Sequence, residues 1–168
     1  MARKAVEKSE ARSGDAPLVG ILMGSASDMN VMEHAREVLT GLGIASELTV
    51  ASAHRSPERV REYARSAERR GIRVLIGGAG MAAHLAGALA AQSLLPVIGV
   101  PLDGSPLGGL DSLLSTAQMP PGVPVATVAI GAAGAKNAGY LAARILALQD
   151  PEIQTRLRDF RDRQARKK

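Results

Sequence analysis

LVGILMGSASD, residues 18–28, is the stretch that decides the fold. Its first six residues form a short apolar run, which predicts a buried strand, and the next five are small or polar. Apolar residues then recur with helical spacing from Val31 to Leu42, so the turn leads directly into a helix. The folded part of the chain is therefore predicted to begin with a strand, a tight turn and an amphipathic helix.

The same unit recurs along the chain. Further strands are predicted at four places: residues 45–50, 74–76, 96–100 and 125–130. Helices are predicted between and after them: residues 57–71, an Ala-rich segment after Gly80, 110–118, 135–148 and a tail helix from Pro151. Continuous apolar strands that alternate with helices are typical of a parallel sheet covered on both faces. We therefore expect a three-layer, doubly wound α/β fold of the flavodoxin-like or Rossmann-like kind.

The length of 168 residues and the apolar share of 46% suit one domain with a normal core. Residues 1–16 are polar and charged, show no signal-peptide pattern, and are expected to form a disordered tail. Residues 17–168 are expected to form a single catalytic domain, with 151–168 as a docking helix between subunits. No apolar run is long enough to span a membrane, so we expect a cytoplasmic protein without a membrane partner.

The net charge of +5 lies mainly in the tails. Residues 17–150 carry ten basic and ten acidic side chains, whereas residues 151–168 carry seven and three. Ile153, Leu157 and Phe160 give the basic segment an apolar stripe, which favours a docking helix over a nucleic-acid surface. The aromatic share of 2% also argues against a protein that stacks on nucleic-acid bases.

Ligands of doubly wound folds bind beyond the carboxyl ends of the strands. The chemistry is therefore expected in the loops that follow the strands: residues 24–28, 52–56, 77–84 and 103–120. In the first loop, Ser25 and Ser27 open a helix and can hold an anion with their hydroxyl and backbone N–H groups. Asp28 would repel a phosphate, so we interpret it as a helix cap or as an acceptor for ribose hydroxyls or an amine.

The second loop reads SAHRS, residues 52–56. His54 can exchange a proton near neutral pH, and Arg55 offers a charged fork for phosphate or carboxylate. A loop histidine bonded to the backbone, beside a surface arginine, explains the same residues equally well. Of the other histidines, His84 is interpreted by default as a hydrogen-bonded packing residue and His34 as a surface residue.

The third loop reads GGAGMAAH, residues 77–84. Gly78, Gly80 and Ala83 match a dinucleotide-binding pattern, and Asp103 follows at a suitable distance. Against that interpretation, the pattern falls in the third strand and helix unit, whereas the fingerprint normally occupies the first. Close approach of the backbone to a planar ligand is the simpler use of these glycines.

The sequence has no cysteine, no metal-ligand cluster, no P-loop and no nucleophile elbow. Disulfides and thiolate chemistry are excluded on this basis, and neither a cofactor nor a metal is expected. A reaction that needs one proton shuttle fits the candidate residues that remain.

At these residues the sequence resembles the N5-carboxyaminoimidazole ribonucleotide mutases, also called the catalytic subunit of phosphoribosylaminoimidazole carboxylase. The resemblance runs from about Val19 to Asp150, with departures at Ala86, where proline is usual, and in the 104–109 loop. Its motifs follow one another in order: MGS at 23–25, SD at 27–28, SAHR at 52–55, GAG at 78–80, AAHL at 82–85, QMP at 118–120, GVPV at 122–125 and AKNA at 135–138.

The resemblance implies an enzyme of purine biosynthesis that moves a carboxylate from the exocyclic amine of the ribonucleotide to C4 of its imidazole ring. Decarboxylation, retention of CO2 and recarboxylation would follow one another, with His54 as general acid and base. A direct CO2-dependent carboxylase of aminoimidazole ribonucleotide is the alternative. The resemblance also implies a homo-octamer supplied by an ATP-dependent synthetase. The implied substrate-binding residues are Ser25, Ser27, Asp28, Ser52, Arg55, Gly78, Ala79, Gly80, Met81, His84 and Leu85.

Overall fold

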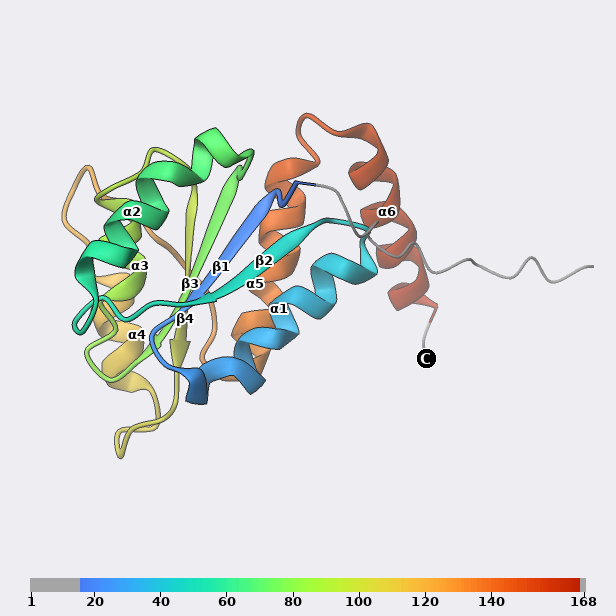
Figure 1. Cartoon of the computed structure of the whole chain (residues 1–168). Helices are drawn as coiled ribbons and strands as arrows, with labels where there is room; N and C mark the ends of the chain where they lie inside the picture. The colour runs from blue at the N-terminus through green and yellow to red at the C-terminus, as the bar shows by residue number, and fades with distance from the viewer. Residues whose placement is uncertain (1–15, 167–168) are drawn as a thin grey trace, which may run out of the picture.

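A computed structural model describes residues 16–166, so the tail expected at 1–16 lies outside the described residues except for Ala16. Five parallel strands form one sheet in the order β2-β1-β3-β4-β5 (Figure 1). This order is that of flavodoxin-like folds, and it confirms the predicted doubly wound architecture. The strands are β1 Val19–Met23, β2 Ser46–Val50, β3 Val74–Gly80, β4 Val97–Leu102 and β5 Ala126–Thr127.

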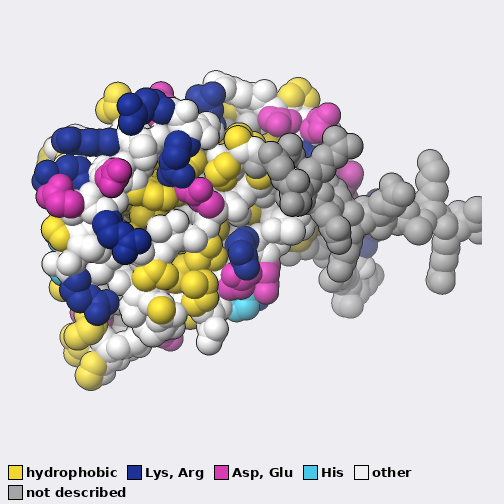
Figure 2. Space-filling view, in the orientation of Figure 1, with side chains coloured by type: hydrophobic (Ala, Val, Ile, Leu, Met, Phe, Trp, Pro, Cys, Tyr) yellow, Lys and Arg dark blue, Asp and Glu magenta, His cyan; other side chains and the backbone are white. Residues whose placement is uncertain are grey.

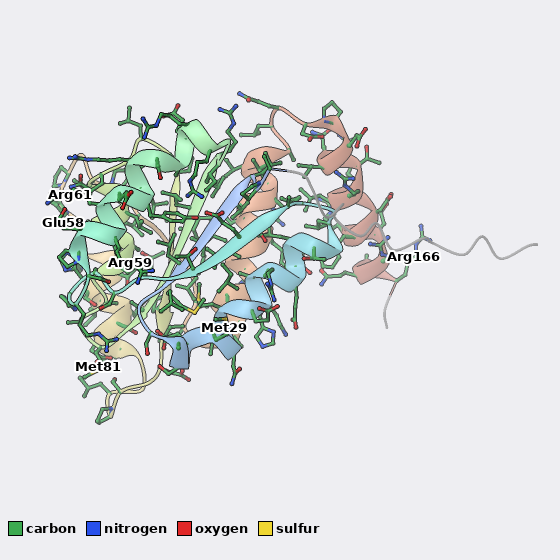
Figure 3. All side chains as sticks on the ribbon, in the orientation of Figure 1. Met29, Glu58, Arg59, Arg61, Met81 and Arg166 are labelled. Atoms are coloured by element: carbon green, nitrogen blue, oxygen red, sulfur yellow. The ribbon has the colours of Figure 1, made fainter. Side chains whose placement is uncertain are left out.

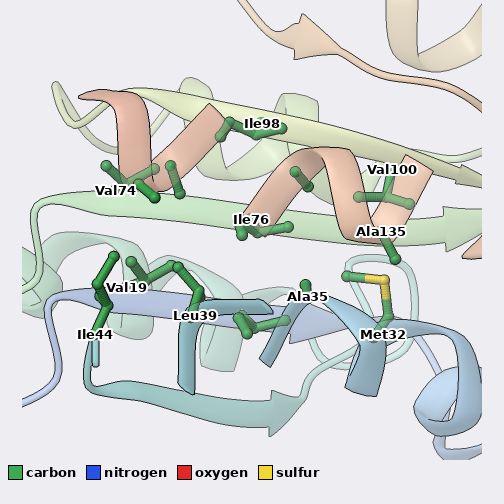
Figure 4. Packing of buried hydrophobic residues seen from close by; sticks show 14 of the residues in the cluster. Val19, Met32, Ala35, Leu39, Ile44, Val74, Ile76, Ile98, Val100 and Ala135 are labelled. Atoms are coloured by element: carbon green, nitrogen blue, oxygen red, sulfur yellow. The ribbon is translucent and has the colours of Figure 1, made fainter. Parts of the chain in front are cut away.

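Helices cover both faces of the sheet (Figure 1). On one face, α1 and α5 pack together over a core of aliphatic side chains that includes Val19, Ile76 and Ile98 (Figure 4). On the other face, α2 and α3 enclose a second core around Leu22 and Leu75, and α4 packs on β4. The helices are α1 Met29–Gly41, α2 Pro57–Ala67, α3 Leu85–Ala90, α4 Leu110–Ala117, α5 Gly131–Leu146 and α6 Pro151–Ala165.

β3 is longer than its predicted range of 74–76, because glycines that read as a loop are paired within the sheet. A Cβ added to Gly77 would lie 3.1 Å from the Ala86 Cα, so this glycine lets α3 pack close to the strand. A Cβ added to Gly78 would collide with the Met32 Sδ on α1. These two glycines therefore make room for helices, whereas the sequence interpretation gave that room to a ligand.

The boundaries of the last strand and helix also differ from those predicted. β5 covers Ala126–Thr127 instead of 125–130, because it is an edge strand that pairs only with Ile98 and Gly99 of β4. α5 begins at Gly131 rather than at residue 135, and Gly139 lies within it. A Cβ on Gly139 would lie 2.9 Å from the Ala35 carbonyl oxygen, so this glycine allows the close packing of α5 on α1.

The C-terminal helix α6 packs on α5 of the same chain. The Asp150 carboxylate accepts hydrogen bonds from the backbone N–H groups of Glu152 and Ile153 and caps the helix. The Phe160 ring stacks on Tyr140 with 4.6 Å between centroids, so its own chain already covers much of Phe160. Docking of α6 on another subunit stays a prediction.

Acidic and basic side chains alternate over the face shown in Figure 2, without a large surface of one sign. None of the helices within residues 16–166 has both the length and the apolar character that crossing a membrane requires.

Candidate active site

A cavity of about 580 Å³ lies beyond the carboxyl ends of the strands, where the loops after β1, β2, β3 and β4 meet. This is the position expected for a ligand, next to the point where the strand order reverses between β1 and β3. Eleven of the twelve residues predicted for the site line it: Ser25, Ser27, Asp28, Ser52, His54, Arg55, Ala79, Gly80, Met81, His84 and Leu85.

The loop after β1 is held by hydrogen bonds among its own side chains. The Asp28 carboxylate accepts from the Ser25 N–H at 3.1 Å, and the Ser25 hydroxyl accepts from the N–H and the hydroxyl of Ser27. Together these form a capping box around a short 3-10 helix, Ala26–Asp28. Two backbone N–H groups that the sequence assigned to an anion are therefore already bonded within the loop. What this loop offers a ligand is chiefly hydroxyl groups and the second carboxylate oxygen of Asp28.

Arg55 supplies the positive charge of the cavity. Its guanidinium reaches the Gly24 carbonyl oxygen and the Ser52 hydroxyl, both at 3.4 Å, and so lies between the loops after β1 and β2. No acidic side chain of residues 16–166 forms an ion pair with it. An exposed arginine fork without a carboxylate partner is suited to bind a phosphate.

Two histidine rings lie side by side at the wall of the cavity. The centroids of the His54 and His84 rings lie 5.0 Å apart, and the rings are tilted by 55°. Both residues are exposed, and within the described chain neither ring nitrogen has a hydrogen-bond partner. The default interpretation of His84 as a packing residue is therefore wrong. His34 lies on the surface as predicted, with its Nδ1 atom 3.0 Å from the Glu37 Oε2 atom.

Gly78 is the one predicted site residue that does not line the cavity. It is buried in β3, where its carbonyl oxygen accepts a hydrogen bond from the Gly24 N–H at 3.2 Å. Gly78 thus joins two strands whose loops form the site, behind the surface that a ligand would touch.

Sequence reasoning missed other residues at the cavity wall, among them Leu102 and Gly104. Leu102 is the last residue of β4, and Gly104 lies in the loop after it, which was expected to carry chemistry. Only the spatial order of the strands brings these two residues beside β3. In the described part of the chain, no three His, Asp or Glu side chains group closely enough to hold a metal ion.

Comparison with known proteins agrees with this geometry. The sequence model of the AIR carboxylase family matches residues 18–167. The chain belongs to the AIR carboxylase family. Among curated members, proteins named N5-carboxyaminoimidazole ribonucleotide mutase are 58% identical in Pyrococcus abyssi, over 87% of this chain and 83% of the relative, and 55% identical in Bacillus subtilis, over 87% and 90%. The family fold is also shared by the crystal structure of Treponema denticola PurE, with a TM-score of 0.82 and 33% identity over 90% of this chain and 93% of that one.

Proposed function

We propose that the protein is an N5-carboxyaminoimidazole ribonucleotide mutase of purine biosynthesis, an isomerase that moves a carboxylate from the exocyclic amine to C4 of the imidazole ring. The observation that carries this proposal is the pair of neighbouring rings, His54 and His84, in one cavity with Arg55, which has no ion-pair partner among residues 16–166. The chain is also up to 58% identical to proteins of that name.

The reaction requires one proton to change places. Cleavage of the N–CO2 bond releases CO2, and the amine nitrogen takes up a proton. C4 then attacks the CO2, a carbon–carbon bond forms, and C4 loses its proton. One acid–base group that first gives and then takes a proton returns to its starting state, so a single histidine suffices. We assign that role to His54, whose exposed ring lies in the cavity without a competing partner in residues 16–166.

The substrate phosphate is assigned to Arg55, with Ser25 and Ser27 as further hydroxyl ligands of the phosphate or ribose. Asp28 and Ser52 lie at the same end and are suited to the ribose hydroxyls or the amine. This arrangement leaves the imidazole ring of the substrate toward the two histidines.

Retention of CO2 requires a wall that excludes water. We assign that wall to the backbone of Ala79, Gly80 and Met81 and to the side chains of Leu85 and Leu102, which all line the cavity. We assign to His84, whose ring lies 5.0 Å from that of His54, the role of orienting the carboxylate.

A labelling experiment tests the mutase against the direct carboxylase. Substrate with ¹³C in the carboxylate on the amine is converted in a buffer that contains unlabelled bicarbonate. A mutase that retains CO2 delivers product in which most of the label is at C4. Product at the isotope ratio of the buffer, or formation of product only from aminoimidazole ribonucleotide and added CO2, would support the carboxylase instead.

The finer predictions are a cytoplasmic homo-octamer whose substrate is supplied by an ATP-dependent synthetase. The support for assembly is the exposure of several large apolar side chains, among them Leu94, Leu107, Leu110 and Leu114. Light scattering should then give a mass about eight times the 17.4 kDa of one chain. A mass of one chain would contradict the octamer.

A further inference from the structure

The turn after β3 contains a strained residue. Met81 has φ 56°, and it is the one residue other than glycine with a positive φ in the described range 16–166. Met81 is 61% exposed and lines the cavity, and Figure 3 shows it at the lower left of the molecule. Such a conformation costs a side-chain-bearing residue about 1–3 kcal/mol and persists only where neighbouring groups hold it.

Ser115, on α4, is the neighbouring group that holds this turn. The Ala83 N–H donates to the Met81 carbonyl oxygen at 2.9 Å and to the Ser115 hydroxyl oxygen at 3.0 Å. The single proton of that hydroxyl has its shortest acceptor in the Asp111 carbonyl oxygen, at 2.8 Å. Ser115 can therefore accept from Ala83 while its own proton remains bonded within α4. The residues that meet here are more than thirty positions apart in the sequence.

The turn determines where His84 stands. His84 directly follows Ala83, and its carbonyl oxygen accepts the first hydrogen bond of α3, from the Ala88 N–H at 2.9 Å. The His84 ring has no hydrogen-bond partner in the described chain, so the position of its backbone sets where the ring lies beside His54. We propose that Ser115 is a positioning residue of the active site, which fixes the Met81 turn and thereby the distance between the two histidine rings.

The proposal rests on the proposed mutase function, and a purely structural serine gives a different expectation. Serine in mid-helix commonly bonds the carbonyl oxygen four residues earlier, which does not stabilise the helix. Alanine also has the higher helix propensity. A structural role alone therefore predicts that Ser115→Ala leaves catalysis unchanged and stability nearly so.

The test compares Ser115→Ala, Ser115→Thr and a control, Ser66→Ala. Ser66 is also a helical serine bonded to an earlier carbonyl oxygen, that of Tyr63 at 3.2 Å, but it lies on α2 outside the cavity. We expect Ser115→Ala to lower kcat about 3–10-fold, the effect of one neutral hydrogen bond, with KM within about twofold. Threonine should restore most of the rate, because it keeps the hydroxyl. Equal kcat in wild type and Ser115→Ala, or no rescue by threonine, would overturn the proposal.

A second readout does not depend on activity. In protein with ¹³C-labelled histidine, Ser115→Ala should shift the ring resonances of His84 and His54 and leave those of His34 in place. Unmoved His84 resonances would overturn the positioning role even if the mutase assay succeeds, whereas an inert wild type with shifted resonances would overturn only the proposed function. In a Met81→Gly background the same substitution should lower kcat less than twofold, because glycine adopts this φ without strain. An undiminished loss there would contradict the role of the strained turn.

Discussion

Replacement of Gly77 by alanine should disturb both the stability and the site, because this glycine sets the distance between β3 and α3. The added Cβ would lie 3.1 Å from the Ala86 Cα, 3.2 Å from the Ala86 nitrogen and 3.2 Å from the Leu89 Cδ1. Two of these three atoms belong to the backbone, so a rotamer change cannot relieve the crowding. α3 must instead move away from the sheet by a few tenths of an ångström or more.

The magnitude follows from two opposing effects. Overpacking of this kind costs about 1–3 kcal/mol. Loss of glycine from the unfolded chain returns about 0.4–1 kcal/mol. The net destabilisation should be about 1–2 kcal/mol, which lowers Tm by about 2–8 °C for a domain of this size. Because His84 directly precedes α3, the same shift should separate its ring from that of His54 and lower kcat.

The assay is urea and thermal denaturation at one fixed protomer concentration, since assembly changes apparent stability. Gly41→Ala is the matched control, because a Cβ at the end of α1 would meet nothing within 4 Å. The control should be stabilised by about 0.5–1 kcal/mol. Gly77→Ala with the stability of its parent or better would refute the argument that Gly77 is required for the packing of α3.

Two further substitutions test the phosphate-binding role of Arg55 and the hydrogen bond between Tyr63 and Glu47. Arg55→Lys should raise KM about tenfold with a smaller change in kcat, because an ammonium group replaces a two-pronged fork for phosphate; steady-state kinetics measures it, and an unchanged KM would remove Arg55 from substrate binding. Tyr63→Phe should cost about 1 kcal/mol, since it removes the 2.5 Å hydrogen bond to Glu47. Burial and that bond raise the pKa of Tyr63, so the folded state holds the phenol proton more tightly than the unfolded chain. The contribution is therefore complete below about pH 10 and is lost as the pH rises further. Urea denaturation should show that the free energy of unfolding of wild type exceeds that of Tyr63→Phe by less at about pH 11 than at about pH 8. A larger difference at the higher pH would contradict this sign.

The fold could be predicted from the sequence because its signals are local. The apolar run before Gly24 and the helical spacing after Asp28 specify strand, turn and helix without reference to the rest of the chain. At the glycines of β3, local reasoning failed. β3 runs on through Gly80. Gly77 leaves room for α3, and Gly78 leaves room for Met32 of α1, a contact between residues far apart in the sequence.

The site divides in the same way. Loops at the carboxyl ends of parallel strands must converge, and so the placement of Ser25, His54 and Arg55 at one cavity could be predicted. The exposure of His84 could not, because its surroundings in the sequence are those of a packed Ala-rich helix. The contact of Ser115 with Ala83 could not be predicted either, because it depends on how α4 lies against the turn after β3.

The most direct test of the central claim is the interconversion of N5-carboxyaminoimidazole ribonucleotide and its C4-carboxylated isomer by wild type, His54→Asn and His34→Asn, without added bicarbonate. Asparagine keeps a polar group of similar size but exchanges no proton, and His34 lies outside the cavity beside Glu37. We predict that His54→Asn lowers kcat by about 10²–10⁴-fold with assembly and Tm unchanged, while His34→Asn remains as active as wild type. A His54→Asn protein that interconverts the two isomers at the rate of wild type would contradict the account.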